Sequence, residues 1–265
     1  MTTIAQRNNV RVVGSGERTI LFVNGFGCDQ SMWRYIIPAF AEQFTLVLFD
    51  HVGGGASDAT AYEPKKYASL NGYAQDVLDI CRELHLTDVT LIGHSVGAMI
   101  GALAAIAEPI HFQRLILLCP SPCYLNEIGY YGGFDRADIE SMLAFMETDY
   151  VGWADTFAPF IMGNPEQPLL AAELSLSFCQ TNPTIARQFA RVTFLSDNRI
   201  DITRLQTPCI LLQSAQDLIA PPEVGTYMEA HIPDATLITL PVAGHCPQLS
   251  APTETLLAME AFLAA

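Results

Sequence analysis

The feature that most constrains the fold of this 265-residue chain is an alternation of short apolar runs with longer helical patterns. Runs such as Ile20-Leu21-Phe22-Val23 are apolar at every position, as expected for parallel strands that are covered on both faces. Strands that alternate with helices predict an α/β fold, with a mainly parallel central sheet and helices on both faces. The predicted strands are Val10–Val13, Thr19–Val23, Thr45–Phe49, Val89–Ile92, Arg114–Leu118, Thr207–Gln213 and Ala235–Leu240.

Three segments between and after these strands are predicted to form helices of the core. In Asn71–His85 the apolar residues recur close to a 3.6-residue period, which is typical of an amphipathic helix. Ser95–Ala107 and Thr253–Leu263 are rich in Ala, Leu, Ile and Met, which favour helix.

The alternation is interrupted between Leu118 and Thr207, where no convincing strand occurs. A segment of this length is too structured for a loop, and in an α/β sheet it would cover the C-terminal ends of the strands, where ligands bind. We therefore expect a core formed by residues 1–122 and 198–265 and a helical lid formed by residues 123–197. Four lid helices are predicted, at Asp135–Tyr150, Gly152–Ile161, Leu169–Cys179 and Thr184–Leu195.

The charge balance limits the expected partners. Thirteen Lys and Arg residues against twenty-eight Asp and Glu residues give a net charge of −15. A field of this sign repels phosphate backbones and anionic lipid headgroups, so we expect neither nucleic acid nor a membrane as a partner. A soluble acidic surface accounts for the charge, and a neutral substrate would be indifferent to it.

Cysteine usage and the N-terminal segment predict a cytoplasmic protein. The seven cysteines contain no Cys-x-x-Cys pair, and an odd number cannot close a complete set of disulfides, so we expect reduced thiols packed as small core residues. No apolar stretch reaches the roughly 18 residues of a membrane span, and the first residues lack the pattern of a secretory signal. The spacing of His and Cys predicts no metal site.

The motif that carries chemistry is Gly93-His94-Ser95-Val96-Gly97, which directly follows a predicted strand and opens a predicted helix. A Gly-x-Ser-x-Gly motif in this context forms a strained turn that exposes the serine, and only glycine fits two positions before and after it. The alternative is an ordinary glycine-containing turn before a helix. The strand, turn and helix context favours Ser95 as a nucleophile.

Two later residues complete a catalytic triad in the order Ser, acid, His. Asp217 follows the strand Thr207–Gln213, and His245 follows the strand Ala235–Leu240, so both emerge at the end of the sheet where Ser95 emerges. In this triad His245 accepts the Ser95 proton and Asp217 orients the imidazole. The alternative for Asp217 is a solvated carboxylate or a helix cap before two prolines, and the triad accounts better for its position.

His94 is the closest competitor of His245 because it precedes Ser95 directly. Adjacent residues on a turn point in different directions, so a structural role is favoured over the role of base. The histidines at 51, 85, 111 and 231 lie in loops, in connecting segments or at a helix end.

Two backbone amides are expected to stabilise the oxyanion of the attacked carbonyl. One is the amide of Val96 at the start of the helix, and the other is the amide of Phe26 in the glycine-containing loop after the second strand. The run Gly53-Gly54-Gly55 lacks the frame of a phosphate-binding loop and is read as a turn. The predicted mechanism requires no cofactor.

Several segments of the chain, taken together, resemble the α/β-hydrolase family that contains the bacterial stress regulator RsbQ and the plant karrikin and strigolactone receptors. The Pro-Ser-Pro-Cys-Tyr-Leu-Asn segment is far more discriminating than the serine motif, and the resemblance covers essentially the whole chain. The segments start at Gly25, Gly72, Gly93, Pro120, Tyr130 and Gly244.

The resemblance implies a four-helix lid over a buried apolar pocket. By analogy, a small hydrophobic ester or a butenolide-like lactone would bind there, and His94 beside the nucleophile would also line the pocket. The family further implies a signalling protein partner of the phosphatase type that docks at the lid. Lid packing is the alternative role for each aromatic residue of the implied pocket. Those residues are Phe26, Phe134, Trp153, Phe157 and Phe194.

Two functions remain open at the level of the sequence. The first is hydrolysis of a small hydrophobic ester or lactone with Ser95 as nucleophile, in a sensing role or as a general carboxylesterase. The second is a signalling module in which the pocket senses a ligand and the lid presents a surface, with little turnover. Cleavage of halides or epoxides normally uses a carboxylate at the position of Ser95, so we set it aside, whereas a haloperoxidase-type side reaction uses the same triad.

Overall fold

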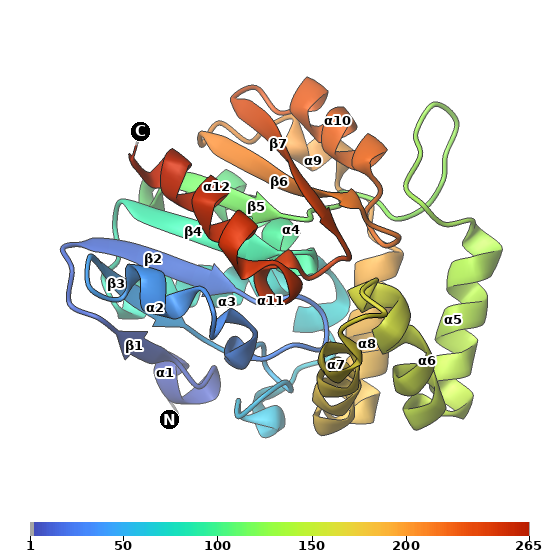
Figure 1. Cartoon of the computed structure of the whole chain (residues 1–265). Helices are drawn as coiled ribbons and strands as arrows, with labels where there is room; N and C mark the ends of the chain where they lie inside the picture. Colours follow the sequence, from blue (N-terminus) through green and yellow to red (C-terminus); the bar gives the residue numbers. More distant parts are fainter. Residues whose placement is uncertain (1–2, 265) are drawn as a thin grey trace.

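The computed structural model describes residues 3–264 and contains the predicted central sheet (Figure 1). Its seven strands lie in the order β1-β3-β2-β4-β5-β6-β7. β1 pairs with β3 in antiparallel orientation, and the other five pairs are parallel. The strands are β1 (Arg11–Val13), β2 (Arg18–Val23), β3 (Phe44–Leu48), β4 (Val89–His94), β5 (Phe112–Leu118), β6 (Cys209–Gln216) and β7 (Ala235–Ala243).

Helices cover both faces of this sheet, and the residues of the central strands are shared between two hydrophobic cores. In β2, Ile20 and Phe22 belong to one core while Leu21 and Val23 belong to the other. The first core includes α2 (Ile37–Phe40) and α12 (Pro252–Ala264), and the second includes α3 (Leu70–Glu83), α4 (Val96–Ala107) and α10 (Pro222–His231). The continuous apolar runs therefore indicate strands buried on both faces, and the predicted fold class is confirmed.

The segment between β5 and β6 forms the predicted helical lid. Its helices lie beyond the C-terminal ends of the strands, on the right of Figure 1. The chain enters and leaves the lid side by side, because the Asn198 amide donates to the Pro122 carbonyl at 2.7 Å and Cys123 pairs with Asp197. The lid helices are α5 (Arg136–Thr148), α6 (Tyr150–Met162), α7 (Pro168–Gln180) and α8 (Pro183–Phe194).

Several short elements and one longer helix have no counterpart in the sequence-based prediction. α10 is the longest, and it escaped the periodicity argument because its buried face is short and includes Gly225, where an added Cβ would lie 3.0 Å from the Leu237 side chain. The other elements are α1 (Ile4–Arg7), α2 (Ile37–Phe40), α9 (Arg199–Ile202), α11 (Pro247–Ser250), η1 (Gln30–Trp33), η2 (Ala59–Ala61), η3 (Lys66–Ala68) and η4 (Pro109–His111).

The cysteines and the helix lengths add two observations. All seven cysteines are free, and Cys179 on α7 is exposed, unlike the core position expected for it. Between residues 3 and 264, no helix combines the length and the apolar character required to cross a bilayer.

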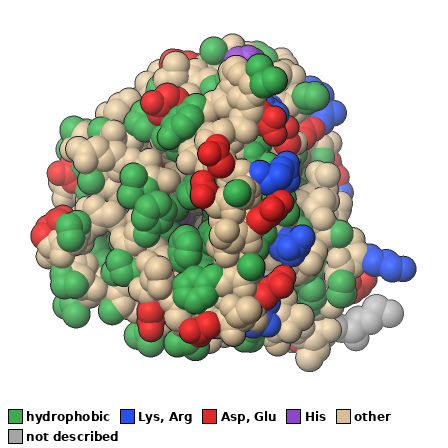
Figure 2. Space-filling model, turned by 90° about the vertical axis from the view of Figure 1, so that its right-hand side faces the viewer, with side chains coloured by type: hydrophobic (Ala, Val, Ile, Leu, Met, Phe, Trp, Pro, Cys, Tyr) green, Lys and Arg blue, Asp and Glu red, His purple; other side chains and the backbone are tan. Residues whose placement is uncertain are grey.

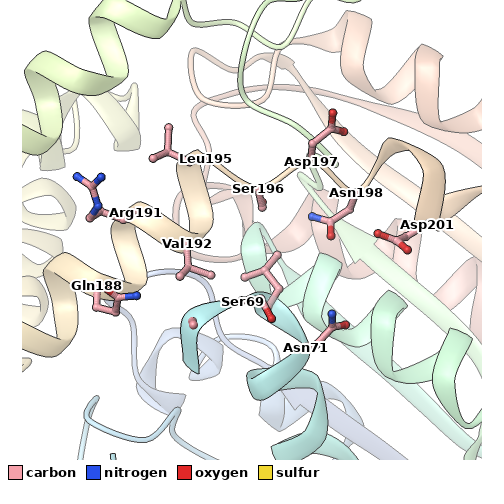
Figure 3. A pocket seen from close by; sticks show the side chains of 12 residues that line it. Ser69, Asn71, Gln188, Arg191, Val192, Leu195, Ser196, Asp197, Asn198 and Asp201 are labelled. Atoms are coloured by element: carbon pink, nitrogen blue, oxygen red, sulfur yellow. The ribbon is translucent and has the colours of Figure 1, made fainter. Parts of the chain in front are cut away.

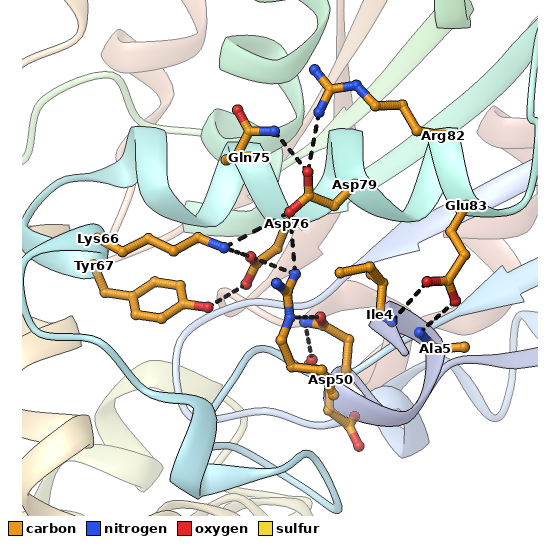
Figure 4. A network of polar contacts seen from close by, with 12 residues as sticks. Ile4, Ala5, Asp50, Lys66, Tyr67, Gln75, Asp76, Asp79, Arg82 and Glu83 are labelled. Atoms are coloured by element: carbon orange, nitrogen blue, oxygen red, sulfur yellow. Dashed lines mark hydrogen bonds and ion pairs between the residues drawn. The ribbon is translucent and has the colours of Figure 1, made fainter. Parts of the chain in front are cut away.

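A buried carboxylate ties the N-terminal segment to α3 (Figure 4). Asp76 is completely buried, and its Oδ1 accepts from Arg7 Nη2 at 2.7 Å and from the Lys66 ammonium. Its Oδ2 accepts from the Tyr67 hydroxyl at 2.8 Å. Three donors thus compensate the desolvation of this charge, and the contacts hold α1, the turn at Lys66 and Tyr67, and α3 together.

We expect Asp76→Ala to lower the free energy of unfolding by about 3–5 kcal/mol, because it removes the buried carboxylate that accepts from two cations and from the Tyr67 hydroxyl. Urea denaturation measures this change. Glu260→Ala on the exposed surface of α12 is the control and should stay within about 0.5 kcal/mol of the parent. A loss of less than about 1 kcal/mol for Asp76→Ala would show that the network contributes little to folding.

Candidate active site

Ser95 lies at a strained turn between β4 and α4. Its φ of 56° and ψ of −126° are rare for a residue with a side chain. The flanking glycines allow this turn. An added Cβ on Gly97 would lie 2.3 Å from the Asn24 carbonyl oxygen, and one on Gly93 would lie 2.6 Å from the Ala98 Cα. The close approach of these backbones explains why the motif needs glycine on both sides of the serine.

Asp217, His245 and Ser95 form one continuous line of hydrogen bonds. His245 Nε2 lies 2.8 Å from Ser95 Oγ, and His245 Nδ1 lies 2.8 Å from Asp217 Oδ2. Asp217 directly follows β6 and His245 follows β7. Because these neighbouring strands are parallel, both residues lie at the C-terminal end of the sheet. All three residues are more than nine-tenths buried. The structure thus brings together the three residues that the sequence analysis singled out.

Asp217 is held in place by two backbone donors as well as by His245. Its Oδ1 accepts from the amides of Ile219 at 2.8 Å and Ala220 at 3.1 Å. Burial alone would raise the pKa of Asp217, but the charge and hydrogen bond of His245 and the two amides hold this pKa below its usual value. The carboxylate is therefore ionised near neutral pH and available to stabilise an imidazolium.

The backbone of His245 is fixed from both the lid and the core. Its amide donates to the Ile161 carbonyl of α6 at 3.0 Å, and its carbonyl lies 2.7 Å from His94 Nε2. Because a carbonyl only accepts, His94 carries its proton on Nε2. The lid therefore contributes directly to the position of the histidine in the triad.

His94 is a buried neutral histidine. Burial, together with the charge of His245, lowers the pKa of His94 to about 3. Its Nε2 is engaged by the His245 carbonyl, and its Nδ1 has no hydrogen-bond partner among residues 3–264. The ring therefore supports the His245 loop and does not hold the proton of Ser95, whose Oγ is hydrogen-bonded to His245.

The two predicted oxyanion donors lie on the two segments that flank Ser95. Val96 is the first residue of α4, so its amide belongs to the positive end of that helix. Phe26 lies in the loop after β2, and this loop reaches the nucleophile, because a Cβ on Gly25 would lie 3.4 Å from Ser95 Cβ. Within the described part of the chain, neither amide donates to a protein acceptor.

Ser95 opens into a small chamber of about 30 Å³ beneath the lid. Of the predicted pocket residues, Phe26, His94 and Phe194 line this chamber. Its walls are mostly apolar, and they combine core loops with side chains from α6, α7 and α8. The other lining residues are Cys28, Ser95, Tyr124, Ile161, Leu174, Phe178, Thr193, Ile219, His245 and Cys246.

Three other predicted pocket residues do not line this chamber. Phe134 and Phe157 line a separate apolar groove of about 470 Å³ between α5 and α6. The ring of Phe157 also stacks on that of Trp153, at 5.6 Å between centroids. Trp153 packs behind the chamber, with its ring centroid 5.0 Å from that of Phe178.

The sequence analysis missed two aromatic residues of the chamber. Tyr124 follows the end of β5 and places its hydroxyl 3.5 Å from Ser95 Oγ. Its position after a central strand was a usable signal, because the C-terminal ends of parallel strands meet at the site. Phe178 comes from α7, and nothing in the sequence distinguishes it from residues that pack within the lid.

A second hollow of about 470 Å³ lies at the base of the lid, between α8 and the start of α3 (Figure 3). Its lining is largely polar and includes Ser69, Asn71 and Asn198. It shares no residue with the chamber and contains neither histidine nor cysteine. It therefore offers no activated nucleophile.

One group of side chains has the spacing of metal ligands. Cys119 Sγ, an Asp217 oxygen and a His245 nitrogen lie within 4.8 Å of one another. Burial and the charge of Asp217 raise the pKa of the Cys119 thiol well above its usual value. A protonated thiol is a poor metal ligand, and the other two groups already bond to each other, so the group fits a triad better than a metal ion.

Comparison with known proteins defines the class of the chain. Residues 18–252 match the family described as alpha/beta hydrolase fold, and the chain belongs to this family. Within it, the chain is similar to a probable esterase from Oryza sativa subsp. japonica, with 38% identity over 95% of this chain and 94% of the relative. It is also 37% identical to the strigolactone esterase D14 of Arabidopsis thaliana over 95% and 94% of the two chains.

A solved structure supports the same classification. A hydrolase from Oleispira antarctica superposes with a TM-score of 0.97 and 41% identity, covering 98% of this chain and 96% of the other. The resemblance to the plant receptor proteins that the sequence predicts is therefore confirmed, and the chain is an enzyme of the α/β-hydrolase class.

The low pKa of His94 predicts a pH dependence of folding. Between 6.5 and about 3, the unfolded chain binds a proton on this histidine that the folded chain does not, so stability falls as the pH is lowered through this range. The slope for one such group is about 1.4 kcal/mol per pH unit. We expect His94→Gln, which removes this titration, to flatten the dependence of the unfolding free energy between about pH 6.5 and pH 5.

Urea denaturation at several pH values measures this slope. His231→Gln, at an exposed position, should leave it unchanged. Equal slopes for the parent and His94→Gln would contradict a neutral, buried His94.

Proposed function

We propose that the chain is a serine hydrolase that cleaves a small hydrophobic ester or lactone through an acyl-enzyme. The observation that carries this proposal is the line of two 2.8 Å hydrogen bonds from Asp217 through His245 to Ser95, which ends in an apolar chamber under the lid. A nucleophile, a base and an orienting carboxylate within hydrogen-bond reach are the requirements of nucleophilic acyl transfer.

The proposed reaction follows from these contacts. Ser95 Oγ attacks the carbonyl carbon while His245 Nε2 takes the hydroxyl proton, and Asp217 stabilises the imidazolium that results. His245 then returns the proton to the leaving alkoxide oxygen as the ester bond breaks. Water hydrolyses the acyl-enzyme by the same route, again with His245 as base. The carboxylic acid and the alcohol are the products, and the ring-opened hydroxy acid is the product of a lactone.

The amides of Phe26 and Val96 are proposed to bind the oxyanion of the tetrahedral intermediates. Both lie on segments adjacent to Ser95, and neither has a protein acceptor among residues 3–264. Donors that are already oriented where negative charge develops lower the barrier without reorganisation. The chain thus supplies every group that the proposed mechanism requires.

The lid sets the size and polarity of the substrate. A chamber of about 30 Å³ is too small for an ester or a lactone, so we propose that the lid moves when a substrate enters. We assign residues 123–197 to this lid and residues 1–122 and 198–265 to the core, because the chain crosses between them at the paired segments near Cys123 and Asp197. Apolar walls favour a hydrophobic substrate. The names of the relatives, which include strigolactone esterases, support a small ester or lactone.

The role of Ser95 is tested with a chromogenic short-chain ester and with a butenolide lactone. We expect Ser95→Ala to lower kcat at least about 10³-fold, because the nucleophile is lost. Asp217→Asn should lower kcat by about 10⁴-fold, because it disturbs the imidazole tautomer and removes the charge that stabilises the imidazolium. Steady-state kinetics measure both values.

The matched control is Ser121→Ala, which removes a buried serine that is bonded to the Cys123 carbonyl and lies outside the chamber. It should leave kcat within about threefold of the parent. Hydrolysis by Ser95→Ala at a rate within about tenfold of the parent would refute the proposal.

A second candidate function is a signalling module that binds a ligand with little turnover and presents the lid to a protein partner. It is favoured by exposed apolar side chains on the lid, which include Val151, Phe160, Leu169 and Leu176. Figure 2 shows hydrophobic side chains gathered around a hollow on this side of the molecule. A single slow turnover, together with protein capture that depends on the lid, would favour this function over fast hydrolysis.

We also propose that the chain acts in the cytoplasm. The seven free cysteines, five of them buried, fit a reducing compartment. Fusion to a fluorescent protein followed by fractionation tests this location, and recovery from an oxidising compartment would contradict it.

A further inference from the structure

We propose that His51 is a positioning residue that fixes the loop carrying the Phe26 amide and connects this loop to lid helix α8. This inference rests on the proposed function, because Phe26 is the proposed oxyanion donor. His51 follows β3, outside the triad and outside the chamber of Ser95. It belongs to none of the groups to which the mechanism assigns a role.

The contact that carries the proposal joins His51 to the start of the oxyanion loop, residues 24–27. His51 Nε2 lies 2.9 Å from the Asn24 carbonyl oxygen, and both residues are buried. Because a carbonyl only accepts, Nε2 carries the proton and donates it. Burial lowers the pKa of His51, so the ring stays neutral and keeps this single tautomer near neutral pH.

The side chain of Asn24 is also hydrogen-bonded, and together with the His51 contact these bonds make Asn24 a fixed anchor for the loop. Its Nδ2 donates to the Phe49 carbonyl at 2.8 Å, and its Oδ1 accepts from Trp33 Nε1 at 2.8 Å. A Cβ on Gly97 would lie 2.3 Å from the same Asn24 carbonyl oxygen that His51 binds. This carbonyl therefore lies between His51 and the helix that begins after the nucleophile.

The anchor is only two residues away from the proposed oxyanion donor. The Asn24 carbonyl belongs to the peptide unit that continues into Gly25, and Gly25 continues into the Phe26 amide. Gly25 has no side chain that could restrict its rotation, so the direction of the Phe26 amide depends on how firmly Asn24 is held. Loss of the His51 hydrogen bond would free the carbonyl and leave it without a partner in a buried position.

His51 also contacts the lid. The ring of Phe189, on α8, lies 5.5 Å from the His51 ring and 5.6 Å from the Phe26 ring, measured between centroids. Tyr73 of α3 stacks on Phe189 at 4.2 Å. Neither Phe189 nor His51 lines the chamber; both line a neighbouring hollow of about 20 Å³ that shares Phe26 and Cys28 with it. The lid side chain Phe189 thus contacts both His51 and Phe26, the residue that carries the proposed oxyanion donor.

This arrangement links lid closure to transition-state stabilisation. With the lid closed, Phe189 packs against His51 and Phe26 and the loop is held from two sides. When α8 moves away to admit substrate, the loop loses the Phe189 contact and keeps its hydrogen bonds to the core, among them that of His51. Hydrolysis is therefore favoured after the lid has closed over the substrate, which limits attack on molecules that do not allow closure.

The test compares two variants of one position. His51→Leu removes the donor, whereas the side-chain amide of His51→Gln offers an N–H at a similar reach. We expect His51→Leu to lower kcat for a chromogenic ester by roughly 10-fold to 100-fold with little change in KM, because the loop acts on the transition state. We expect His51→Gln to recover kcat to within about threefold of the parent. A purely structural role predicts a lower Tm for His51→Leu with an unchanged kcat, and that result would overturn the proposal.

A measurement that does not require turnover separates this inference from the proposed function. In hydrogen exchange, the backbone amides of residues 24–28 should exchange faster in His51→Leu than in the parent, while those of β4 stay protected. If the parent hydrolyses no ester, faster exchange of the loop still supports the positioning role and only the proposed function fails. Unchanged exchange in the loop overturns the positioning role whatever the activity.

The link to the lid is tested by a double-mutant cycle with Phe189→Leu. If His51 and Phe189 act through the same loop, the loss of kcat in the double variant should be smaller than the product of the two single losses. Independent, multiplicative losses would show that the lid does not act through His51.

Discussion

The hydrogen bond between His245 Nε2 and Ser95 Oγ joins two residues that are 150 positions apart, and the arrangement of the rest of the chain makes this contact possible. The parallel strands β4, β6 and β7 all end on the same side of the sheet, and the loops that follow them carry Ser95, Asp217 and His245. The tight packing of Gly97 against Asn24 then allows the serine turn to form. The fold thus serves mainly to hold three loops in a fixed relation.

The lid contacts His245 and the proposed oxyanion loop as well as covering them. The Ile161 carbonyl of α6 accepts the amide of His245, and the aromatic residues of α7 and α8 surround the ring of Phe26. A lid that moves to admit substrate therefore also releases contacts of the base and of the proposed oxyanion loop. Chemistry and access are coupled because the same helices contribute to both.

The alternation of apolar runs and helical periods was enough to predict the sheet, the core helices α3, α4 and α12 and the four lid helices, because these patterns depend on local burial, but it did not reveal α10. The proximity of Asp217 and His245 to Ser95 was also predictable, since all three residues follow the C-terminal ends of strands in the sheet. The pocket was less predictable. Phe134 and Phe157 lie in a groove outside the chamber, and Phe178 was not recognised, because the packing of amphipathic lid helices depends on contacts that are not local in sequence. The hydrogen bonds of His51 and His94 are likewise tertiary contacts.

The most direct test of the account is covalent trapping of the intact protein with an alkyl fluorophosphonate, followed by peptide mass spectrometry. The account predicts a single adduct on Ser95 that forms rapidly in the parent, slowly in Asp217→Asn and not at all in Ser95→Ala. An adduct on another residue, or labelling of Ser95 at the same rate in a His245→Ala variant, would contradict the central claim that His245 and Asp217 activate this serine.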